Sequence, residues 1–218
     1  MTSPALRLQH IRDTISSAAT VARRDPDDVC LIAVSKTRSS EEIEPLIVAG
    51  HRDFGESRVQ EALAKWPDLM DRHPGIRLHC IGRLQSNKAA EAVHLFQAIH
   101  SVDRMSLLDA LAREAAKARR FPDVYLQVNI GEEDQKGGCA LPELGELAAA
   151  VSKSPLKLAG LMAIPPLGVE PAPFFALLAK LARRHDVTGL SMGMSSDYPT
   201  AVKLGATAVR VGTAMFEA

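Results

Sequence analysis

Aromatic residues and long apolar runs are scarce in this sequence. Phe, Trp and Tyr make up 4% of its 218 residues. No run of about 18 apolar residues, the length of a membrane-spanning helix, occurs. The N-terminal segment also lacks the apolar core of a secretory signal peptide. These absences argue against a membrane span and against secretion, so we expect a cytoplasmic protein with no membrane partner.

Cysteine is scarce as well, and it is not arranged for metal binding. The three cysteines, Cys30, Cys80 and Cys139, lie far apart and form no ligand pair of the kind found in zinc sites. The seven histidines show no HxH or HxxxH spacing. We therefore predict free cysteines in a reducing compartment and no metal site.

An excess of charge of either sign is also missing. Lys plus Arg and Asp plus Glu each number 26, which gives a formal net charge of zero, and like charges form no long block. Nucleic acids and anionic membranes select strongly basic surfaces. We therefore expect no nucleic-acid partner.

The sequence does contain a regular alternation of strand-like and helix-like segments. Apolar strand candidates begin near residues 29, 51, 76, 98, 124, 156, 188 and 207, with helical patterns between them. Eight such units without a linker favour a closed parallel barrel. An open doubly wound sheet is the alternative, but the first strand is not followed by a glycine-rich dinucleotide turn. We predict an α/β fold, a single (β/α)8 TIM-type barrel domain over residues 1–218 with an extra N-terminal helix.

One lysine stands at the end of the first predicted strand. The apolar segment that begins at Leu31 ends on Lys36. Chemistry in β/α barrels is carried out at the carboxyl ends of the strands, and a lysine there can form a Schiff base with a carbonyl ligand. A lysine that only extends from the strand end into solvent is the alternative.

Small residues follow the seventh and eighth predicted strands. They are Gly193, Ser195, Ser196, Gly212 and Thr213. Loops at these two positions of a barrel often bind phosphate through backbone N–H groups and hydroxyls. Together with a lysine on the same face of the barrel, they predict a carbonyl ligand that carries a phosphate. Pyridoxal 5'-phosphate fits this description.

Seven segments extend this pattern into a family resemblance. They are AVSKT (33–37), FGE (54–56) with VQEA (59–62), HCIGRLQSNK (79–88), VNI (128–130) with KGG (136–138), GLMAIPP (160–166), SMGMSSD (191–197) and RVGTAMF (210–216). Over nearly its whole length the chain resembles the pyridoxal phosphate homeostasis protein family, also called the YggS or PROSC-type family. The fold of that family is similar to the N-terminal barrel domain of alanine racemase.

The resemblance implies cofactor-binding roles for ten residues. Lys36 would hold pyridoxal phosphate as a Schiff base, and Arg210 would face the pyridine nitrogen. The phosphate would be bound by Ser195, Gly212 and Thr213. The remaining residues would wall the cofactor or lie near its ring: His79, Ile81, Asn87, Met162 and Met194. Two positions depart from the family pattern, since Ser57 replaces an asparagine and Arg83 replaces a proline or histidine.

Arg210 has a consequence for the chemistry of the cofactor. A guanidinium group stays protonated and only donates hydrogen bonds, so a pyridine nitrogen that faces it stays unprotonated. Such a ring is a poor electron sink, which disfavours carbanion chemistry. The family resemblance implies a carrier without clear turnover that takes part in vitamin B6 homeostasis and amino-acid balance, with pyridoxal-phosphate-dependent apoenzymes as recipients. The alternative for Arg210 is a strand-end arginine paired with a carboxylate.

Two enzymatic alternatives stay open. A pyridoxal-phosphate-dependent amino-acid racemase with weak activity would need a second base, but the only tyrosines are Tyr125 and Tyr198. We also expect no second domain after the barrel, and hence a monomer. A Schiff-base aldolase would need an acid/base pair near Lys36. Its candidates are Glu56, Asp103 and Asp197, which we interpret instead as residues at helix starts.

Overall fold

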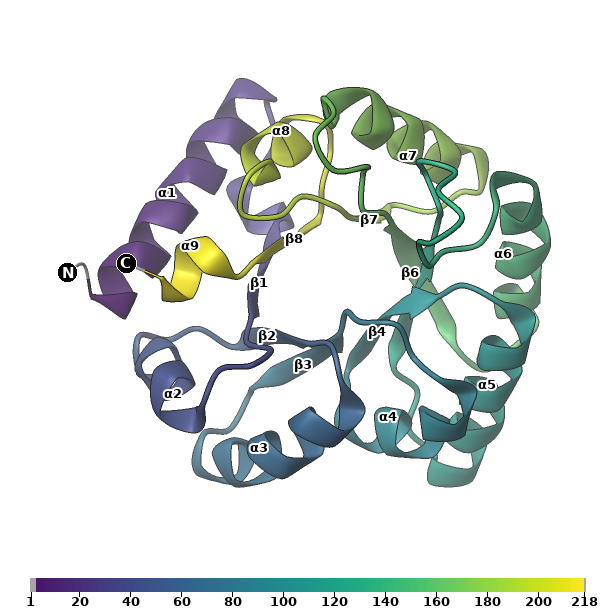
Figure 1. Cartoon of the computed structure of the whole chain (residues 1–218), viewed down its shortest axis with the longest axis horizontal. Helices are drawn as coiled ribbons and strands as arrows, with labels where there is room; N and C mark the ends of the chain where they lie inside the picture. The colour runs from purple at the N-terminus through teal and green to yellow at the C-terminus, as the bar shows by residue number, and fades with distance from the viewer. Residues whose placement is uncertain (1–2, 218) are drawn as a thin grey trace.

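Eight parallel strands pair in chain order, and β8 returns to pair with β1, which closes the sheet into a barrel. This computed structural model describes residues 3–217. Figure 1 looks down the barrel and shows the helices outside the ring of strands. The predicted (β/α)8 barrel is confirmed. The predicted domain bounds, 1 and 218, lie outside the described residues.

The strands lie close to their predicted positions. They are β1 (Cys30–Val34), β2 (Asp53–Glu56), β3 (Arg77–Cys80), β4 (Ala98–Val102), β5 (Asp123–Gln127), β6 (Lys157–Met162), β7 (Gly189–Ser191) and β8 (Ala208–Val211). Apolar and β-branched residues dominate most of them, as expected for strands that are covered on both faces.

The helices follow the strands as expected for β/α units. They are α1 (Pro4–Val21), α2 (Ser40–Val48), α3 (Val59–Arg72), α4 (Ala89–Leu95), α5 (Met105–Ala118), α6 (Leu144–Ser152), α7 (Ala172–Arg184), α8 (Tyr198–Lys203) and α9 (Thr213–Phe216). Three single turns of 3₁₀ helix add η1 (Pro26–Asp28), η2 (Ser86–Lys88) and η3 (Leu141–Glu143). None of the helices within residues 3–217 is long and apolar enough to cross a membrane.

The extra N-terminal helix packs against the helices that follow β7 and β8. Leu8, Ile11 and Ile15 form its buried stripe, and α1 packs against α8 and α9 (Figure 1). Arg7 Nε donates to the carbonyl of Met215 at 2.8 Å, which joins α1 to α9 directly. The first helix thereby supports the segment that follows β8.

Large apolar side chains pack on the outer face of the strands, under the helices. Phe54 on β2 and Trp66 on α3 are fully buried, with ring centroids 4.9 Å apart. Burial of one side chain of this size contributes roughly 1.5–3 kcal/mol to folding. This outer core fixes α3 against β2, and α3 carries residues that hold the candidate site.

Polar side chains meet in the interior of the barrel. His100 Nδ1 on β4 lies 2.8 Å from Ser191 Oγ on β7, and because these strands are not neighbours, the contact crosses the barrel interior. A Cβ atom at Gly160 would come within 2.5 Å of the Tyr125 ring, so glycine makes room for that ring. The interior is thus a packed layer of aromatic and polar groups.

Candidate functional site

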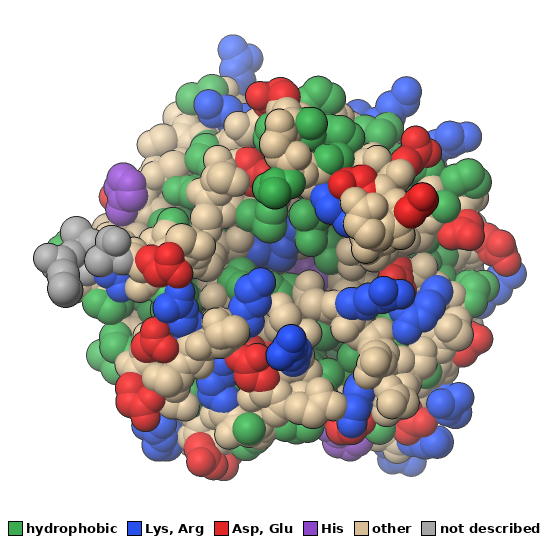
Figure 2. Space-filling view, in the orientation of Figure 1, with side chains coloured by type: hydrophobic (Ala, Val, Ile, Leu, Met, Phe, Trp, Pro, Cys, Tyr) green, Lys and Arg blue, Asp and Glu red, His purple; other side chains and the backbone are tan. Residues whose placement is uncertain are grey.

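Six of the ten predicted site residues line one cavity. They are Lys36, Met194, Ser195, Arg210, Gly212 and Thr213. The cavity has a volume of about 760 Å³, which is within the range of small-molecule sites. The space-filling view shows a hollow at the centre of the face, with Lys and Arg side chains around it (Figure 2). Strand ends far apart in the sequence therefore converge here, as the barrel topology predicts.

The other four predicted residues do not line this cavity. His79 and Met162 are buried, Ile81 is half-buried, and Asn87 is exposed in η2. His79 lies in the barrel interior, where its ring packs against His100. The assignment of these four residues to the cofactor stays a prediction.

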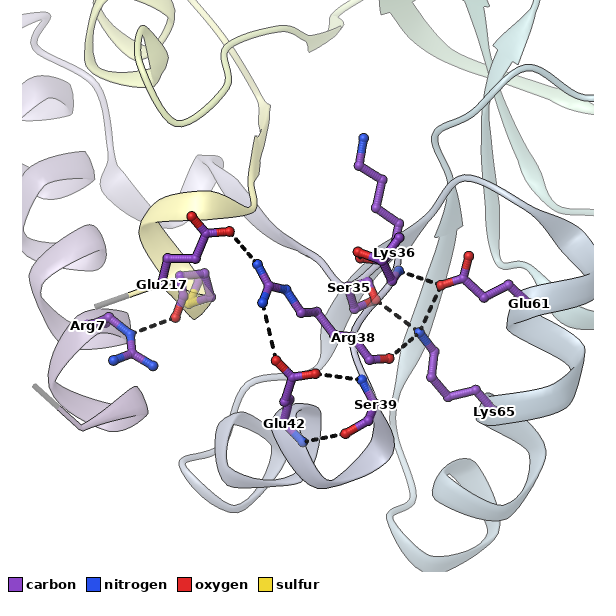
Figure 3. A network of polar contacts seen from close by, with 11 residues as sticks. Arg7, Ser35, Lys36, Arg38, Ser39, Glu42, Glu61, Lys65 and Glu217 are labelled. Carbon is purple, nitrogen blue, oxygen red and sulfur yellow. Dashed lines mark hydrogen bonds and ion pairs between the residues drawn. The ribbon is translucent and has the colours of Figure 1, made fainter. Parts of the chain in front are cut away.

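Lys36 presents its amine to the cavity. It directly follows Ser35, the first residue after β1, and its Nζ atom makes no hydrogen bond or ion pair with any residue from 3 to 217. In Figure 3 its side chain points away from the surrounding polar network. The adjacent Thr37 has φ 65°, a left-handed conformation that is strained for a β-branched residue. Because Nζ has no partner among residues 3–217, the amine is available to a ligand in the cavity.

The segment of residues 35–38, here called the lysine turn, is held by side chains of α3. Lys65 Nζ donates to the carbonyls of Ser35 at 2.9 Å and Arg38 at 3.0 Å. Glu61 Oε1 accepts the N–H of Thr37 at 2.5 Å. Figure 3 shows these contacts around the base of Lys36. They satisfy the backbone groups of a strained turn that cannot form a regular hydrogen-bond ladder.

The lysine turn rests on a buried carboxylate. Glu56 Oε1 accepts hydrogen bonds from Ser35 Oγ at 2.7 Å and Trp66 Nε1 at 2.9 Å, and it forms an ion pair with Lys65 at 2.8 Å. The interpretation of Glu56 as a residue at a helix start is therefore wrong. It is the last residue of β2, and its side chain is fully buried behind the turn.

Arg38 and Glu217 close one side of the cavity. Arg38 pairs with Glu217 at 2.6 Å and with Glu42 at 3.2 Å, and its guanidinium lies over the Phe216 ring. Sequence reasoning missed these lining residues, together with Val34, Thr37 and Ala214. The position of Thr37 and Arg38 directly after Lys36 was an available signal. The role of Glu217 depends on the path of α9, which the sequence pattern does not specify.

Residues 193–197 and 212–214, here called the C-terminal loops, form the opposite wall. Gly193 has φ +93°, and a Cβ there would come within 2.5 Å of Ala201 Cβ. The Met194 N–H donates to Asp197 Oδ1 at 2.6 Å, and the Gly212 N–H donates to Ser195 Oγ at 3.2 Å. Short-range contacts and glycine thus shape this wall.

Of the two other predicted helix-start carboxylates, Asp197 does stand at a helix start, whereas Asp103 does not hold the N-cap position. Asp197 occupies the N-cap position of α8, but its side chain accepts the Met194 N–H rather than an N–H of the helix. Asp103 pairs with Arg104 at 2.6 Å, and Arg104 holds the N-cap position of α5. With Glu56 buried behind the turn, none of the three proposed aldolase carboxylates lines the cavity.

Arg210 reaches the cavity floor from β8. It is buried, and it donates to Ser191 Oγ at 2.5 Å through Nη1 and to the Ala163 carbonyl at 3.0 Å through Nη2. Within residues 3–217 it forms no ion pair, so the reading as a carboxylate-paired arginine is wrong. Burial lowers the pKa of Arg210 to about 10, so it stays cationic at neutral pH. Of the five N–H groups of a guanidinium, three have no hydrogen-bond partner among residues 3–217.

The donor set suits a ligand with a carbonyl group and an anionic group. One wall offers a free amine, the floor offers a buried guanidinium, and the opposite wall offers hydroxyls of Ser195, Ser196 and Thr213. The two tyrosines do not line the cavity. Tyr125 stacks on His100 in the barrel interior, with centroids 4.2 Å apart. Neither tyrosine is therefore placed to act as a second base across the cavity from Lys36.

Comparison with known proteins gives a consistent assignment. The family described as the alanine racemase N-terminal domain matches residues 6–218. A pyridoxal phosphate homeostasis protein of Pseudomonas aeruginosa is 41% identical over 224 residues, covering 100% of this chain and 96% of the relative. The protein of that name from Escherichia coli K12 is 39% identical over 228 residues, covering 100% and 97%.

Solved structures agree with these relatives. PipY of Synechococcus elongatus, solved with pyridoxal phosphate bound, superposes with a TM-score of 0.81 at 41% identity, covering 93% of this chain and 99% of PipY. Alanine racemase of Corynebacterium glutamicum superposes with a TM-score of 0.65 at 19% identity, covering 93% of this chain and 60% of the racemase. The second match concerns the fold alone, and it confirms the predicted likeness to the alanine racemase barrel.

Proposed function

The chain belongs to the pyridoxal phosphate homeostasis protein family, and we propose that it binds pyridoxal 5'-phosphate in the cavity between the lysine turn and the C-terminal loops. The observation that carries this proposal is the free Lys36 amine opposite a floor formed by Arg210, with hydroxyls on the facing wall. The cofactor combines an aldehyde, a pyridine nitrogen and a phosphate. The three parts of the cavity complement these three groups.

Lys36 holds the cofactor covalently and reversibly. Its nitrogen bonds to the aldehyde carbon and a water molecule leaves, which gives a Schiff base. Ser195, Gly212 and Thr213 bind the phosphate through hydroxyl and N–H groups, and Arg210 donates to the pyridine nitrogen. Met194 packs against the ring. Because Arg210 only donates, the ring nitrogen stays unprotonated and the bound cofactor is a weak electron sink.

The biological role that fits this site is storage and delivery of a reactive aldehyde. A Schiff base on one lysine limits the reaction of pyridoxal phosphate with other amines, and its reversibility allows transfer. We place the protein in vitamin B6 homeostasis and amino-acid balance, as a cytoplasmic monomer that hands the cofactor to dependent apoenzymes without turnover of its own. The absence of tyrosine from the cavity lining supports this role over the racemase alternative.

The absorption spectrum of the purified protein tests the proposal. We expect a visible Schiff-base band after incubation with pyridoxal phosphate, and borohydride reduction should fix the cofactor onto the peptide that contains Lys36. Lys36→Ala should lose the band. Lys180→Ala, which removes an exposed lysine on α7, should keep it. A wild-type protein without the band in excess cofactor would contradict the proposal.

A second measurement separates the carrier from the racemase. Loaded protein is incubated with L-alanine in D₂O, and exchange of the α-proton is followed by NMR. A carrier leaves the α-proton in place over many cofactor-exchange times. Steady exchange that Lys36→Ala abolishes would favour the racemase instead.

A further inference from the structure

Arg210 is the first member of a series of hydrogen-bonded side chains that crosses the barrel interior. In this subsection that series is called the chain. Its Nη1 atom lies 2.5 Å from Ser191 Oγ, and Ser191 Oγ lies 2.8 Å from His100 Nδ1. His100 Nε2 lies 3.0 Å from His79 Nδ1, and His79 Nε2 lies 3.0 Å from Asp53 Oδ1. The chain thus runs from the cavity floor to Asp53, the first residue of β2, at the opposite end of the barrel.

The chemistry of the two ends fixes the direction of every hydrogen bond. Arg210 only donates, so Ser191 Oγ accepts from it, and the serine proton is left for His100 Nδ1, the other partner of that hydroxyl within the described residues. His100 must then carry its proton on Nε2 and donate it to His79. His79 in turn donates from Nε2 to the Asp53 carboxylate. Both histidines are therefore neutral Nε2–H tautomers.

Two pKa directions agree with this assignment. Burial is the main cause that lowers the pKa of His100 well below 6.5, and the charge of Arg210 acts in the same direction. For Asp53, burial alone would raise the pKa, but the hydrogen bond from His79 and nearby positive charges lower it overall. With both histidines as the Nε2–H tautomers that the hydrogen bonds assign, the chain has a cation at one end, an anion at the other and uncharged links between them.

Electrostatics explains why such a chain is useful beneath the cavity. A buried cation is costly unless it is paired, and Arg210 has no ion pair within residues 3–217. Each neutral link points its proton away from the guanidinium and toward the carboxylate, so every link stabilises both charges. The chain also fixes Nη1 of Arg210, which orients the remaining N–H groups toward the cavity.

We propose that Ser191, His100, His79 and Asp53 are positioning residues that orient Arg210 toward the cofactor's pyridine nitrogen. This inference rests on the proposed function. It assigns a role to Asp53, a residue at the end of the barrel away from the cavity, and it places His79 behind Arg210 rather than against the cofactor ring. It also disfavours a metal at the nearby cluster of Cys30, Asp53 and His79, because His79 Nε2 carries a proton and has no lone pair for a cation.

NMR tests the hydrogen-bond chain without any cofactor. In protein labelled with ¹⁵N-histidine, long-range ¹H–¹⁵N correlations distinguish the two neutral tautomers from imidazolium. We expect the Nε2–H pattern for both His79 and His100 at pH 7, assigned by comparison with His79→Gln and His100→Gln. A protonated Nδ1 on either residue would overturn the direction of the chain.

Ligand binding tests the positioning role. We compare pyridoxal phosphate with its 1-deaza analogue, in which a C–H group replaces the pyridine nitrogen. Asp53→Asn keeps the size of the side chain but removes the terminal charge, and it should weaken pyridoxal phosphate binding about 5-fold, the order of one ordinary hydrogen bond. It should leave the affinity for the analogue unchanged. Ser191→Ala, next to Arg210, should act in the same direction with a larger effect.

Asp123→Asn is the matched control. Asp123 is the first residue of β5 at the same end of the barrel as Asp53. It pairs with Lys157 and is not a member of the hydrogen-bonded series that begins at Arg210. It should change neither affinity. If Asp53→Asn weakens the binding of both ligands equally, or changes the binding of neither, the inference is overturned while the proposed function stands. A wild-type protein that binds no pyridoxal phosphate overturns the proposed function, and the positioning role with it.

Discussion

The two walls of the cavity are built in different ways. The lysine turn is held from behind by long side chains of α3, with Lys65 and Glu61 bonding its backbone and Glu56 buried beneath them. The C-terminal loops are held by their own short-range contacts and by Gly193 in a left-handed conformation. One wall depends on buried charge from another element, and the other depends on local backbone geometry.

The difference matches the task of each wall. A reacting amine must leave its turn at a defined angle while its side chain stays free. The support therefore comes from behind and leaves Lys36 Nζ without a partner in the part of the chain that the structure describes. An anion site needs small residues that let the backbone approach and hydroxyls that donate. Substitutions in the two walls should therefore fail differently, the first through stability and the second through binding.

The largest effect is expected from Lys65→Met. This change leaves Glu56 as a buried carboxylate without its ammonium partner, which should cost about 3–5 kcal/mol of unfolding free energy. It also frees the backbone carbonyls of the lysine turn, so Schiff-base formation should slow. Urea denaturation followed by circular dichroism measures the first effect, and the growth rate of the visible band measures the second.

Two controls sharpen this result. Lys117→Met removes an exposed ion pair with Glu114 on α5 and should cost no more than about 0.5 kcal/mol. The double variant Lys65→Met with Glu56→Gln should recover part of the loss, because the buried charge is removed as well. A single variant as stable as Lys117→Met would show that α3 does not support the lysine turn.

The next effect is expected in the other wall. Gly193→Ala places a Cβ within 2.5 Å of Ala201 Cβ in a left-handed conformation, which should cost about 1–3 kcal/mol. It should also displace Met194 and Ser195 and weaken binding of pyridoxal phosphate and of inorganic phosphate. Thermal unfolding and fluorescence titration measure the two effects.

Gly168→Ala provides the matched control for that variant. Gly168 has φ +78°, yet a Cβ there would meet nothing within 4 Å. It should show only the backbone cost, about 1 kcal/mol, and unchanged affinity. If both glycine variants bind alike, the close packing behind Gly193 does not shape the anion site.

These contrasts also show how far the sequence alone was informative. The β/α alternation predicted the barrel, and the barrel brought the end of β1 together with the ends of β7 and β8, so Lys36, Ser195 and Gly212 could be predicted as one site. The residues that support the lysine turn could not be predicted in this way. Glu61 and Lys65 are one turn apart on α3, but a helical pattern does not say which backbone groups they reach, and a glutamate after FG was mistaken for a helix start.

The interior chain was out of reach for a related reason. His100 and Ser191 are 91 residues apart, and their contact depends on which residues of β4 and β7 point inward at the same height. A register shift between β4 and β5 alters that alternation. Single-sequence patterns specify strand positions within a few residues, whereas this contact requires the register.

An effect of similar size is expected from acid. Neither wall contains a histidine, but burial lowers the pKa of His51 from 6.5 to about 4, against the raising effect of its hydrogen bond to the Asp53 carbonyl. Between these pH values the unfolded chain binds the proton more readily, so stability falls as the pH drops from 6.5 to 4, by up to about 3 kcal/mol. Burial of His100 acts in the same direction.

Urea unfolding across that pH range measures this dependence. His51→Gln should be less stable than wild type at pH 7 and should lose stability less steeply on acidification. The arrangement of both walls should persist until the protein unfolds, so cofactor loss and unfolding should coincide. Cofactor loss well above the unfolding pH, or an unchanged slope in His51→Gln, would contradict this account.

The smallest effect is expected where the two walls meet. Glu217 pairs with Arg38 at 2.6 Å, but its side chain is 56% exposed, and an exposed pair contributes at most about 1 kcal/mol. Glu217→Gln removes a negative charge from the cavity lining and releases the positive charge of Arg38. Both changes favour an anionic phosphate, so the affinity for pyridoxal phosphate should rise about twofold at low salt, and the gain should vanish at high salt because exposed charges are screened. Glu114→Gln, which removes a half-buried carboxylate on α5 outside the cavity lining, should leave the affinity unchanged. A salt-independent loss of affinity in Glu217→Gln would mean that the pair holds the walls together rather than tuning charge, and the two walls would then be one coupled unit.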